Sequence, residues 1–331
     1  MSTERKKAHI GLALESQTGI NTLDPRFNYE PLLSAHPSDD PKPFSFLGKT
    51  MRVPIWISSM TGGTDEAMQI NKNLARAAKE FGMGMGLGSC RILLERDIYP
   101  EHFRLREFIG HEVPFYANLG IAQIEKAILS KNLDPIQKMM ESLEVDGLII
   151  HVNPMQEWLQ PEGDRLKEKP IDMIREFVDQ VSYPVVVKEV GQGMGPASLH
   201  ELLKLPLQAI EFAAYGGTNF AKLELLRTDP ARQNMIEPIA FVGNGATEML
   251  ESVNSFINQN GQTPVKELII SGGIKDFLDG YYFTKKSKLP AIYGQAAMFL
   301  RYAREDYETL RGFVHSQVKG LQMANSFLTI K

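Results

Sequence analysis

The sequence predicts an α/β fold made of a single (β/α)₈ barrel, preceded by an irregular N-terminal arm. Three observations lead to this prediction. Short apolar runs alternate with longer amphipathic segments, eight such runs occur within 331 residues, and polar residues follow nearly every run. A chain of this length can form one large barrel or two ordinary domains.

The eight apolar runs are the predicted strands, and they occupy residues 53–60, 83–89, 114–120, 145–153, 183–191, 209–217, 268–273 and 290–295. Segments with helical periodicity lie between them, among them 66–81, 121–129, 171–181 and 197–203. Apolar strands that alternate with helices are typical of a parallel sheet covered on both faces. A doubly wound sheet shows the same alternation, but the strand number and the polar strand ends favour the barrel. A further apolar run at 239–243 is expected to be a short inserted strand.

Residues 1–50 are predicted to form the arm, and residues 51–331 are predicted to form the barrel. Turn-forming sequences such as Asp39-Asp40-Pro41-Lys42-Pro43 recur in the first segment, and they favour irregular structure. We expect the arm to pack on or over the active face of the barrel.

The composition is that of an ordinary globular protein, with 43% hydrophobic and 23% charged residues. The net charge of −4 does not favour binding to nucleic acid or to an anionic membrane. No signal peptide is recognisable, and no segment reaches the ~18 apolar residues of a membrane span. Because the single Cys90 cannot form an internal disulfide, a reducing compartment is favoured. The chain is therefore expected to be cytoplasmic.

Glycine turns follow two neighbouring late strands, on the face where a barrel of this kind has its active site. Gly216-Gly217-Thr218 follows the sixth strand, and Ser271-Gly272-Gly273 ends the seventh. Such turns present backbone N–H groups that bind phosphate. One glycine pair alone is weak evidence, because many turns need glycine. Two pairs in adjacent loops favour a phosphate site.

Charged and polar residues end the fourth and fifth strands. Lys188 ends an apolar strand, either as the ion-pair partner of an acid such as Glu189 or as a cation that faces a cofactor or substrate oxygen. His151 and Asn153 share one strand face, and Gln156 and Glu157 follow in the loop. A carboxylate with few acidic neighbours is a candidate ligand for Mg²⁺, which often binds through one or two carboxylates plus substrate phosphate. The sequence shows no zinc-type Cys/His cluster, no hydrolase elbow and no dinucleotide fingerprint.

Together these motifs resemble type 2 isopentenyl-diphosphate isomerase, from Arg5 to about Ala297. The most specific segment is His151-Val-Asn-Pro-Met-Gln-Glu-Trp-Leu-Gln-Pro-Glu-Gly-Asp164, and Val187–Gly191, Gly216–Asn219 and Ser59–Gly63 add support. The resemblance implies interconversion of isopentenyl and dimethylallyl diphosphate without net redox change. It also implies FMN, reduced by NADPH or NADH, as the acid–base cofactor, Mg²⁺ on the diphosphate, and a homo-oligomer, either a tetramer or an octamer.

The resemblance assigns roles to residues at matching positions. Catalytic roles fall on Gln156, His151 and Asn153, and the metal ligand is Glu157. The substrate would be bound by Arg5, Lys6, His9, Arg91 and Gln156. The flavin would be bound by Ser59, Met60, Thr61, Gly62, Ser89, Asn118, Lys188, Thr218, Gly272, Gly273, Lys275, Ala296 and Ala297. From the residues alone, the basic N-terminus is either a solvated chain end or an arm that closes over a diphosphate.

The sequence departs from the family pattern at several positions. Cys90 stands in place of glutamine, Ala8 in place of an acidic residue, Tyr215 in place of a small residue, and Lys275 in place of arginine. A lysine can still pair with phosphate, although without a bidentate fork. Two alternatives stay open: a flavin-dependent oxidoreductase of the 2-hydroxy-acid oxidase type, and a non-catalytic binder of flavin or prenyl diphosphate. The intact segment 151–157 favours the isomerase.

Overall fold

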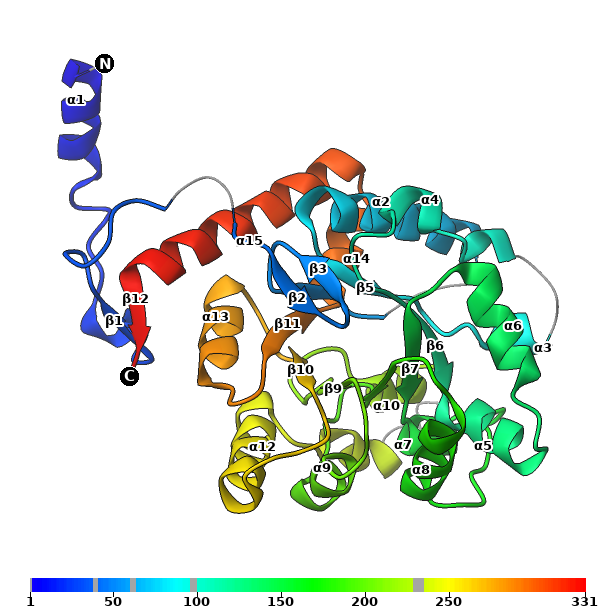
Figure 1. Cartoon of the computed structure of the whole chain (residues 1–331). Coiled ribbons are helices and arrows are strands. Elements are labelled where there is room, and N and C mark those ends of the chain that lie inside the picture. The colour runs from blue at the N-terminus through cyan, green and yellow to red at the C-terminus, as the bar shows by residue number, and fades with distance from the viewer. Residues whose placement is uncertain (1, 38–40, 60–63, 96–99, 229–234) are drawn as a thin grey trace.

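The structure is a computed structural model that describes residues 2–37, 41–59, 64–95, 100–228 and 235–331 (Figure 1). Eight parallel strands close into a barrel in the order β10-β11-β4-β5-β6-β7-β8-β9. They are β4 (Ile55–Ile57), β5 (Gly84–Gly86), β6 (Phe115–Gly120), β7 (Gly147–His151), β8 (Val185–Lys188), β9 (Ala209–Glu211), β10 (Glu267–Ser271) and β11 (Ala291–Gln295). Each lies within or overlaps a predicted strand, so the predicted barrel is confirmed.

Helices surround the barrel, as Figure 1 shows. The longer ones are α2 (Asp65–Phe81), α5 (Ile121–Leu129), α6 (Asp134–Leu143), α8 (Pro170–Gln180), α12 (Ala246–Asn260), α13 (Phe277–Lys286) and α15 (Tyr307–Phe327). The shorter ones are α3 (Arg91–Glu95), α4 (Arg106–Ile109), α7 (Pro154–Leu159), α9 (Pro196–Leu202), α10 (Phe220–Leu226), α14 (Ala297–Ala303) and the 3₁₀ turn η2 (Pro100–His102). No helix in the described ranges is long and apolar enough to cross a membrane.

The bounds of α2 follow directly from its sequence. The side chain of Thr64 accepts a hydrogen bond from the backbone N–H of Ala67 at 3.1 Å, which satisfies one of the donors left free at a helix start. Asp65 and Glu66 lie in the first turn, where the helix dipole favours negative charge. Gly82 ends the helix with φ of 72°, a left-handed conformation that glycine adopts without strain.

A hairpin closes the end of the barrel at which the strands begin. It consists of β2 (Phe44–Phe46) and β3 (Lys49–Met51), which pair antiparallel. Its side chains Phe46, Leu47 and Met51 pack into the barrel interior against buried residues that include Trp56 and Tyr116. The backbone N–H of Leu47 donates to Glu267, the first residue of β10. The hairpin leaves uncovered the opposite end of the barrel, where the strands finish and where a ligand could bind.

The N-terminal segment contains more regular structure than its sequence predicts. It forms the helix α1 (Ser2–Leu12), the 3₁₀ turn η1 (Ile20–Thr22) and β1 (Phe27–Tyr29). β1 pairs with β12 (Leu328–Ile330) at the C-terminus, and this pairing attaches the arm to the barrel beside α13. Residues 4–23 are exposed throughout, and α1 stands away from the barrel in Figure 1. Closure of the arm over the active face therefore stays a prediction.

The strand expected at 239–243 is wrong. This segment lies mainly in the 3₁₀ helix η3 (Glu237–Phe241). Pro238 is the physical reason, because proline has no N–H to donate to a strand ladder and its fixed φ suits the first turn of a helix. The segment is nevertheless an insertion between β9 and β10, as expected, and it packs against α10.

Candidate active site

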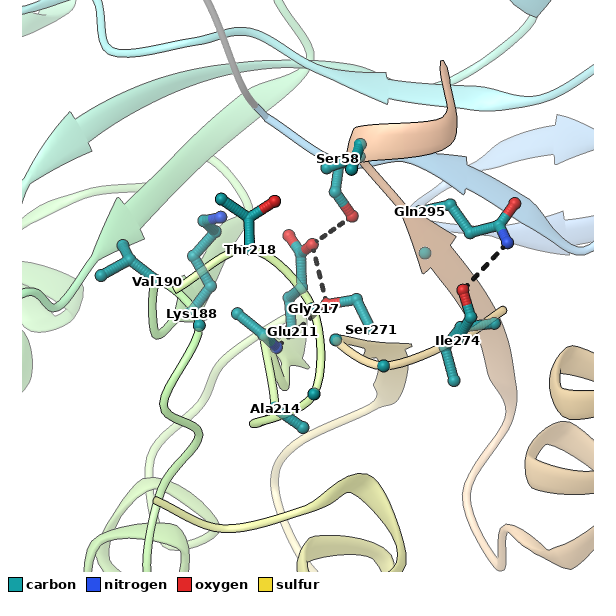
Figure 2. Close-up of a pocket in the computed structure, with 18 of the residues that line it drawn as sticks. Ser58, Lys188, Val190, Glu211, Ala214, Gly217, Thr218, Ser271, Ile274 and Gln295 are labelled. Carbon is teal, nitrogen blue, oxygen red and sulfur yellow. Dashed lines mark hydrogen bonds between the residues drawn. The ribbon is translucent and has the colours of Figure 1, made fainter. Parts of the chain in front are cut away.

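A cavity of about 300 Å³ opens at the end of the barrel where the strands finish (Figure 2). Its wall comes from the ends of β4, β8, β9, β10 and β11 and from the loops that follow them. Eight of the residues predicted to bind the flavin line this cavity: Ser59, Lys188, Thr218, Gly272, Gly273, Lys275, Ala296 and Ala297. Met60, Thr61 and Gly62 lie outside the described residues. The structure therefore brings the end of the fifth strand and the loops after the sixth, seventh and eighth strands into one site.

The two glycine turns lie against each other, as their sequence positions predict. A Cβ atom on Gly217 would lie 3.2 Å from the backbone nitrogen of Gly273. Gly272 has φ of +85°, and a Cβ atom there would lie 2.1 Å from the carbonyl oxygen of Ala214, so only glycine fits. In the part of the chain that the structure describes, the N–H groups of Gly217, Gly272 and Gly273 donate to no protein acceptor. They remain available to an anion.

Lys188 is buried, with 6% of its surface exposed, and it lines the cavity. The alternative of an ion pair with Glu189 is not found. The carboxylate of Glu189 instead accepts the backbone N–H groups of Gly191, Gln192 and Gly193 at 2.6 to 3.1 Å. Burial raises the pKa of Glu189 despite these hydrogen bonds. Within the described ranges, Lys188 forms no ion pair closer than 4.0 Å, so its charge is directed at the cavity.

His151 lies at the end of β7, where its Nδ1 is 2.9 Å from Oδ1 of Asn118. Burial, assisted by the positive charge of Lys188, lowers the pKa of His151 to about 3. The ring is therefore neutral near pH 7, and it can contribute a hydrogen bond but no positive charge. Asn118 orients this histidine and is absent from the cavity wall.

A hydrogen-bond network joins Asn153 and Gln156 to an acid on another helix. Nδ2 of Asn153 donates to Oε1 of Gln156 at 3.0 Å, which leaves Nε2 of Gln156 to donate to Oε1 of Glu224 at 3.1 Å. Gln160 donates to the same oxygen of Glu224 at 2.7 Å. The other oxygen of Glu224 pairs with Arg227 at 2.8 Å. Both ends of the Gln156 amide are thereby fixed.

Glu157 is buried next to this network. Its Oε1 accepts from Nδ2 of Asn153 at 3.1 Å, and its Oε2 accepts from the backbone N–H of Asp164 at 2.7 Å. Each carboxylate oxygen has a second lone pair that can bind a metal ion. No group of three or more His, Cys, Asp or Glu side chains suited to a metal occurs among the described residues. A metal here would have to bind through Glu157 together with oxygens of the substrate and water.

Of the other predicted substrate ligands, Arg91 is connected to the segment that contains Glu157 and Asp164, whereas the arm residues are not. Arg91 pairs with Asp164 at 3.0 Å and with Glu95 at 2.6 Å, so it is connected to the loop that follows α7. Ser89, which was predicted to bind the flavin, is exposed two residues before Arg91, the first residue of α3. Arg5, Lys6 and His9 are exposed on α1 and are not brought to the cavity.

Sequence reasoning missed two acids of this site, Glu224 and Glu211. Glu224 is 3% exposed on α10, on the same face as Ala221 and Leu225. Glu211 is completely buried at the end of β9 and lines the cavity. The sequence could have indicated them, because an acid within an apolar run is rare and a buried carboxylate needs a partner.

No family model matches the chain. Curated relatives do match it over most of its length. The isopentenyl-diphosphate delta-isomerase of Rickettsia felis is 34% identical over 316 residues, which cover 92% of this chain and 86% of the relative. The enzyme of the same name from Rickettsia typhi is 33% identical over 312 residues, covering 91% and 86%. This chain belongs to the isopentenyl-diphosphate delta-isomerase family. The resemblance inferred from the motifs is confirmed, and so is the prediction of an isomerase.

Solved structures of more distant proteins share the fold of this isomerase-family chain. A flavocytochrome b2 variant with sulfite bound has a TM-score of 0.60 and 14% identity, covering 90% of this chain and 70% of that chain. A mandelate oxidase variant with a monooxide FMN adduct has a TM-score of 0.58 and 14% identity, covering 99% and 98%. At these identities the likeness shows the barrel fold alone.

Proposed function

We propose that this chain interconverts isopentenyl diphosphate and dimethylallyl diphosphate, moving a carbon–carbon double bond without net oxidation or reduction. Family membership supports the reaction. The observation that carries the proposal for this chain is the fixed amide of Gln156, whose Oε1 and Nε2 are held by Asn153 and Glu224. Glu224 lies on α10, whose first residue, Phe220, lines the cavity. A rigid polar group next to a bound alkene orients it for proton transfer.

The cavity fits reduced FMN, for which NADPH or NADH is the proposed reductant. Three buried polar atoms in its wall lack a hydrogen-bond partner in the described part of the chain: Ser59 Oγ, Glu211 Oε2 and Gln295 Oε1. The glycine N–H groups and Lys275 would hold the phosphate, and Lys188 would face the electron-rich ring edge. When bound, the reduced flavin would supply the acid–base group that an unactivated alkene needs.

The residues around β7 and α7 would hold the diphosphate. Arg91 provides positive charge, while the neutral His151 provides a hydrogen bond only. Glu157 would bind Mg²⁺ together with diphosphate oxygens and water, in keeping with the preference of Mg²⁺ for few carboxylates. Arg5 and Lys6 on the arm would add further positive charge, and His9 would add a hydrogen-bonding group. A diphosphate held by these residues would orient the alkene at the other end of the substrate toward Gln156.

The oxidase alternative finds less support in the residues. Oxidation of a 2-hydroxy acid needs a basic histidine and an arginine that holds the carboxylate, and the cavity wall contains neither residue type among the described residues. Its cations are Lys188 and Lys275.

A pair of glutamine variants tests the proposed role of Gln156. Gln156→Leu should lower kcat for the diphosphate isomerisation by about 100-fold, because misplacing a bound group costs about that much. Gln160→Leu removes an amide that donates to the same oxygen of Glu224 but lies one helical turn further along, so it should lower kcat far less. Equal losses in the two variants, measured by NMR of the product, would remove Gln156 from the reacting centre.

A further inference from the structure

Glu211 is a completely buried carboxylate in the cavity wall that the mechanism above does not use. It ends β9, and its Oε1 accepts hydrogen bonds from Oγ of Ser58 at 2.6 Å and from Oγ of Ser271 at 3.1 Å. Its Oε2 has no partner in the described ranges. A buried carboxylate oxygen without a donor is strongly unfavourable, so a ligand group is expected to supply one.

The two serines fix which oxygen is free. Oγ of Ser271 accepts the backbone N–H of Ala213 at 2.9 Å, so its own hydrogen is left to point at Oε1 of Glu211. Ser58 directly follows β4, on another part of the barrel wall, and donates to the same oxygen (Figure 2). The carboxylate is held from two sides, and Oε2 is presented in a defined position.

The strand order places Glu211 in the middle of the cavity. β9 lies between β8, which ends in Lys188, and β10, which leads into Gly272 and Gly273. Lys188 and Glu211 are paired in register. Figure 2 agrees, since Glu211 lies between Lys188 and Thr218 on one side and Ile274 and Gln295 on the other. A flavin nucleotide with its ring at Lys188 and its phosphate at the glycine turns must pass Glu211 with its connecting chain.

We infer that Glu211 recognises the hydroxyl groups of that connecting chain. This inference rests on the FMN site proposed above. The oxygens of the phosphate and of the ring carbonyl groups only accept hydrogen bonds and are repelled by a carboxylate. The ring also carries N–H donors, but in the proposed orientation the ring lies at Lys188 and the chain passes Glu211, so a chain hydroxyl group donates to Oε2. Glu211 therefore selects a flavin phosphate with a polyhydroxylated chain over one with a plain alkyl chain, and it disfavours a phosphate bound in the middle of the cavity.

The test compares two flavins on the apoprotein, FMN and a flavin phosphate whose five-carbon chain carries no hydroxyl group. Binding is followed by flavin fluorescence, without any turnover. The wild-type protein should bind FMN roughly tenfold to a hundredfold more tightly than the alkyl flavin, the range for a hydrogen bond to a charged group. Glu211→Gln should weaken FMN binding by about tenfold and leave binding of the alkyl flavin within about threefold. Glu267→Gln, which alters a carboxylate at the opposite end of the barrel, should change neither.

Each possible failure has a separate meaning. If Glu211→Gln weakened the binding of both flavins equally, the inference would be overturned, because Glu211 would then act without contacting the chain hydroxyl groups. Equal affinity of the wild-type protein for the two flavins would also overturn it, and this measurement does not depend on a variant that folds. A wild-type protein that binds neither flavin would overturn the FMN site itself, and this inference with it.

Discussion

Glu224 holds Gln156 in place, and replacing Glu224 with glutamine tests how much that support contributes to the rate. The charged oxygen Oε1 accepts Nε2 of Gln156 at 3.1 Å, and Oε2 pairs with Arg227 at 2.8 Å. In Glu224→Gln the new amide can keep its oxygen toward Gln156 only by turning its NH₂ group toward the guanidinium of Arg227, which is also a donor. A hydrogen bond to a charged acceptor contributes about 1.5–3 kcal/mol and a neutral one about 0.5–1.5 kcal/mol. The expected loss is therefore about 1.4 kcal/mol, or roughly tenfold in kcat.

Steady-state kinetics with isopentenyl diphosphate would measure this loss. KM should stay nearly unchanged, because Glu224 contacts Gln156 and Gln160 rather than the residues proposed to bind the diphosphate. Arg227→Gln is the matched control. It removes the partner of Oε2 together with an exposed ion pair to Glu162. The Arg227 side chain is 56% exposed, and partly exposed ion pairs contribute about 0–1 kcal/mol. An unchanged kcat in Glu224→Gln, or a rise in KM alone, would refute the proposed support of Gln156.

Three further predictions concern stability, metal binding and the glycine turn. Because the pKa of His151 is lowered to about 3, the unfolded chain binds a proton below about pH 6.5 that the folded chain does not. The free energy of unfolding should fall as pH decreases from about 6.5 toward 3, by up to ~1.4 kcal/mol per pH unit from this residue. Urea titrations at several pH values should show that the free energy of unfolding of His151→Gln depends less steeply on pH than that of the wild-type protein. The same pH dependence in both proteins would contradict the lowered pKa of His151. Glu157→Gln should raise the Mg²⁺ concentration for half-maximal activity by at least about tenfold. Glu162→Gln, which alters an exposed acid in the loop after α7, should not. Equal Mg²⁺ dependence of both variants would exclude Glu157 as a ligand. Gly272→Ala places a Cβ atom 2.1 Å from a backbone oxygen and should destabilise the fold by about 3 kcal/mol or more. Gly261→Ala has the same kind of φ but free space around it, so it should cost about 1–2 kcal/mol in thermal unfolding; similar losses at both positions would argue against the tight turn.

The barrel could be predicted from sequence because each strand is a short apolar run and each connection carries a helical period. Two segments differ from the prediction, the run at 239–243 and the helix α1, and each has a local cause. The run at 239–243 is apolar enough for a strand, but Pro238 starts a 3₁₀ turn there. α1 begins with polar and charged residues, and its apolar residues Ile10 and Leu12 are exposed, so it has no apolar face directed at a core and periodicity could not reveal it.

The cavity was predictable from the sequence where its lining residues lie directly at strand ends. Lys188, Thr218, Gly272 and Gly273 line it because the barrel gathers the strand ends into one rim. Glu224 and Glu211 were missed because their roles depend on contacts between distant segments. Glu224 meets Gln156 across 68 positions of sequence, and Glu211 meets Ser58 across 153. Single-sequence patterns contain no information on such pairs, since periodicity gives a residue's face and not its partner.

The most direct test of the central claim is an anaerobic incubation of the purified protein with FMN, NADPH, Mg²⁺ and isopentenyl diphosphate, with the products followed by NMR and the flavin by absorbance. We predict dimethylallyl diphosphate in many-fold excess over protein, a flavin that stays reduced throughout, and no product when FMN or Mg²⁺ is omitted. Product formation that consumes NADPH in equal amount, or a reduced, flavin-loaded protein that yields no dimethylallyl diphosphate, would contradict the isomerase account.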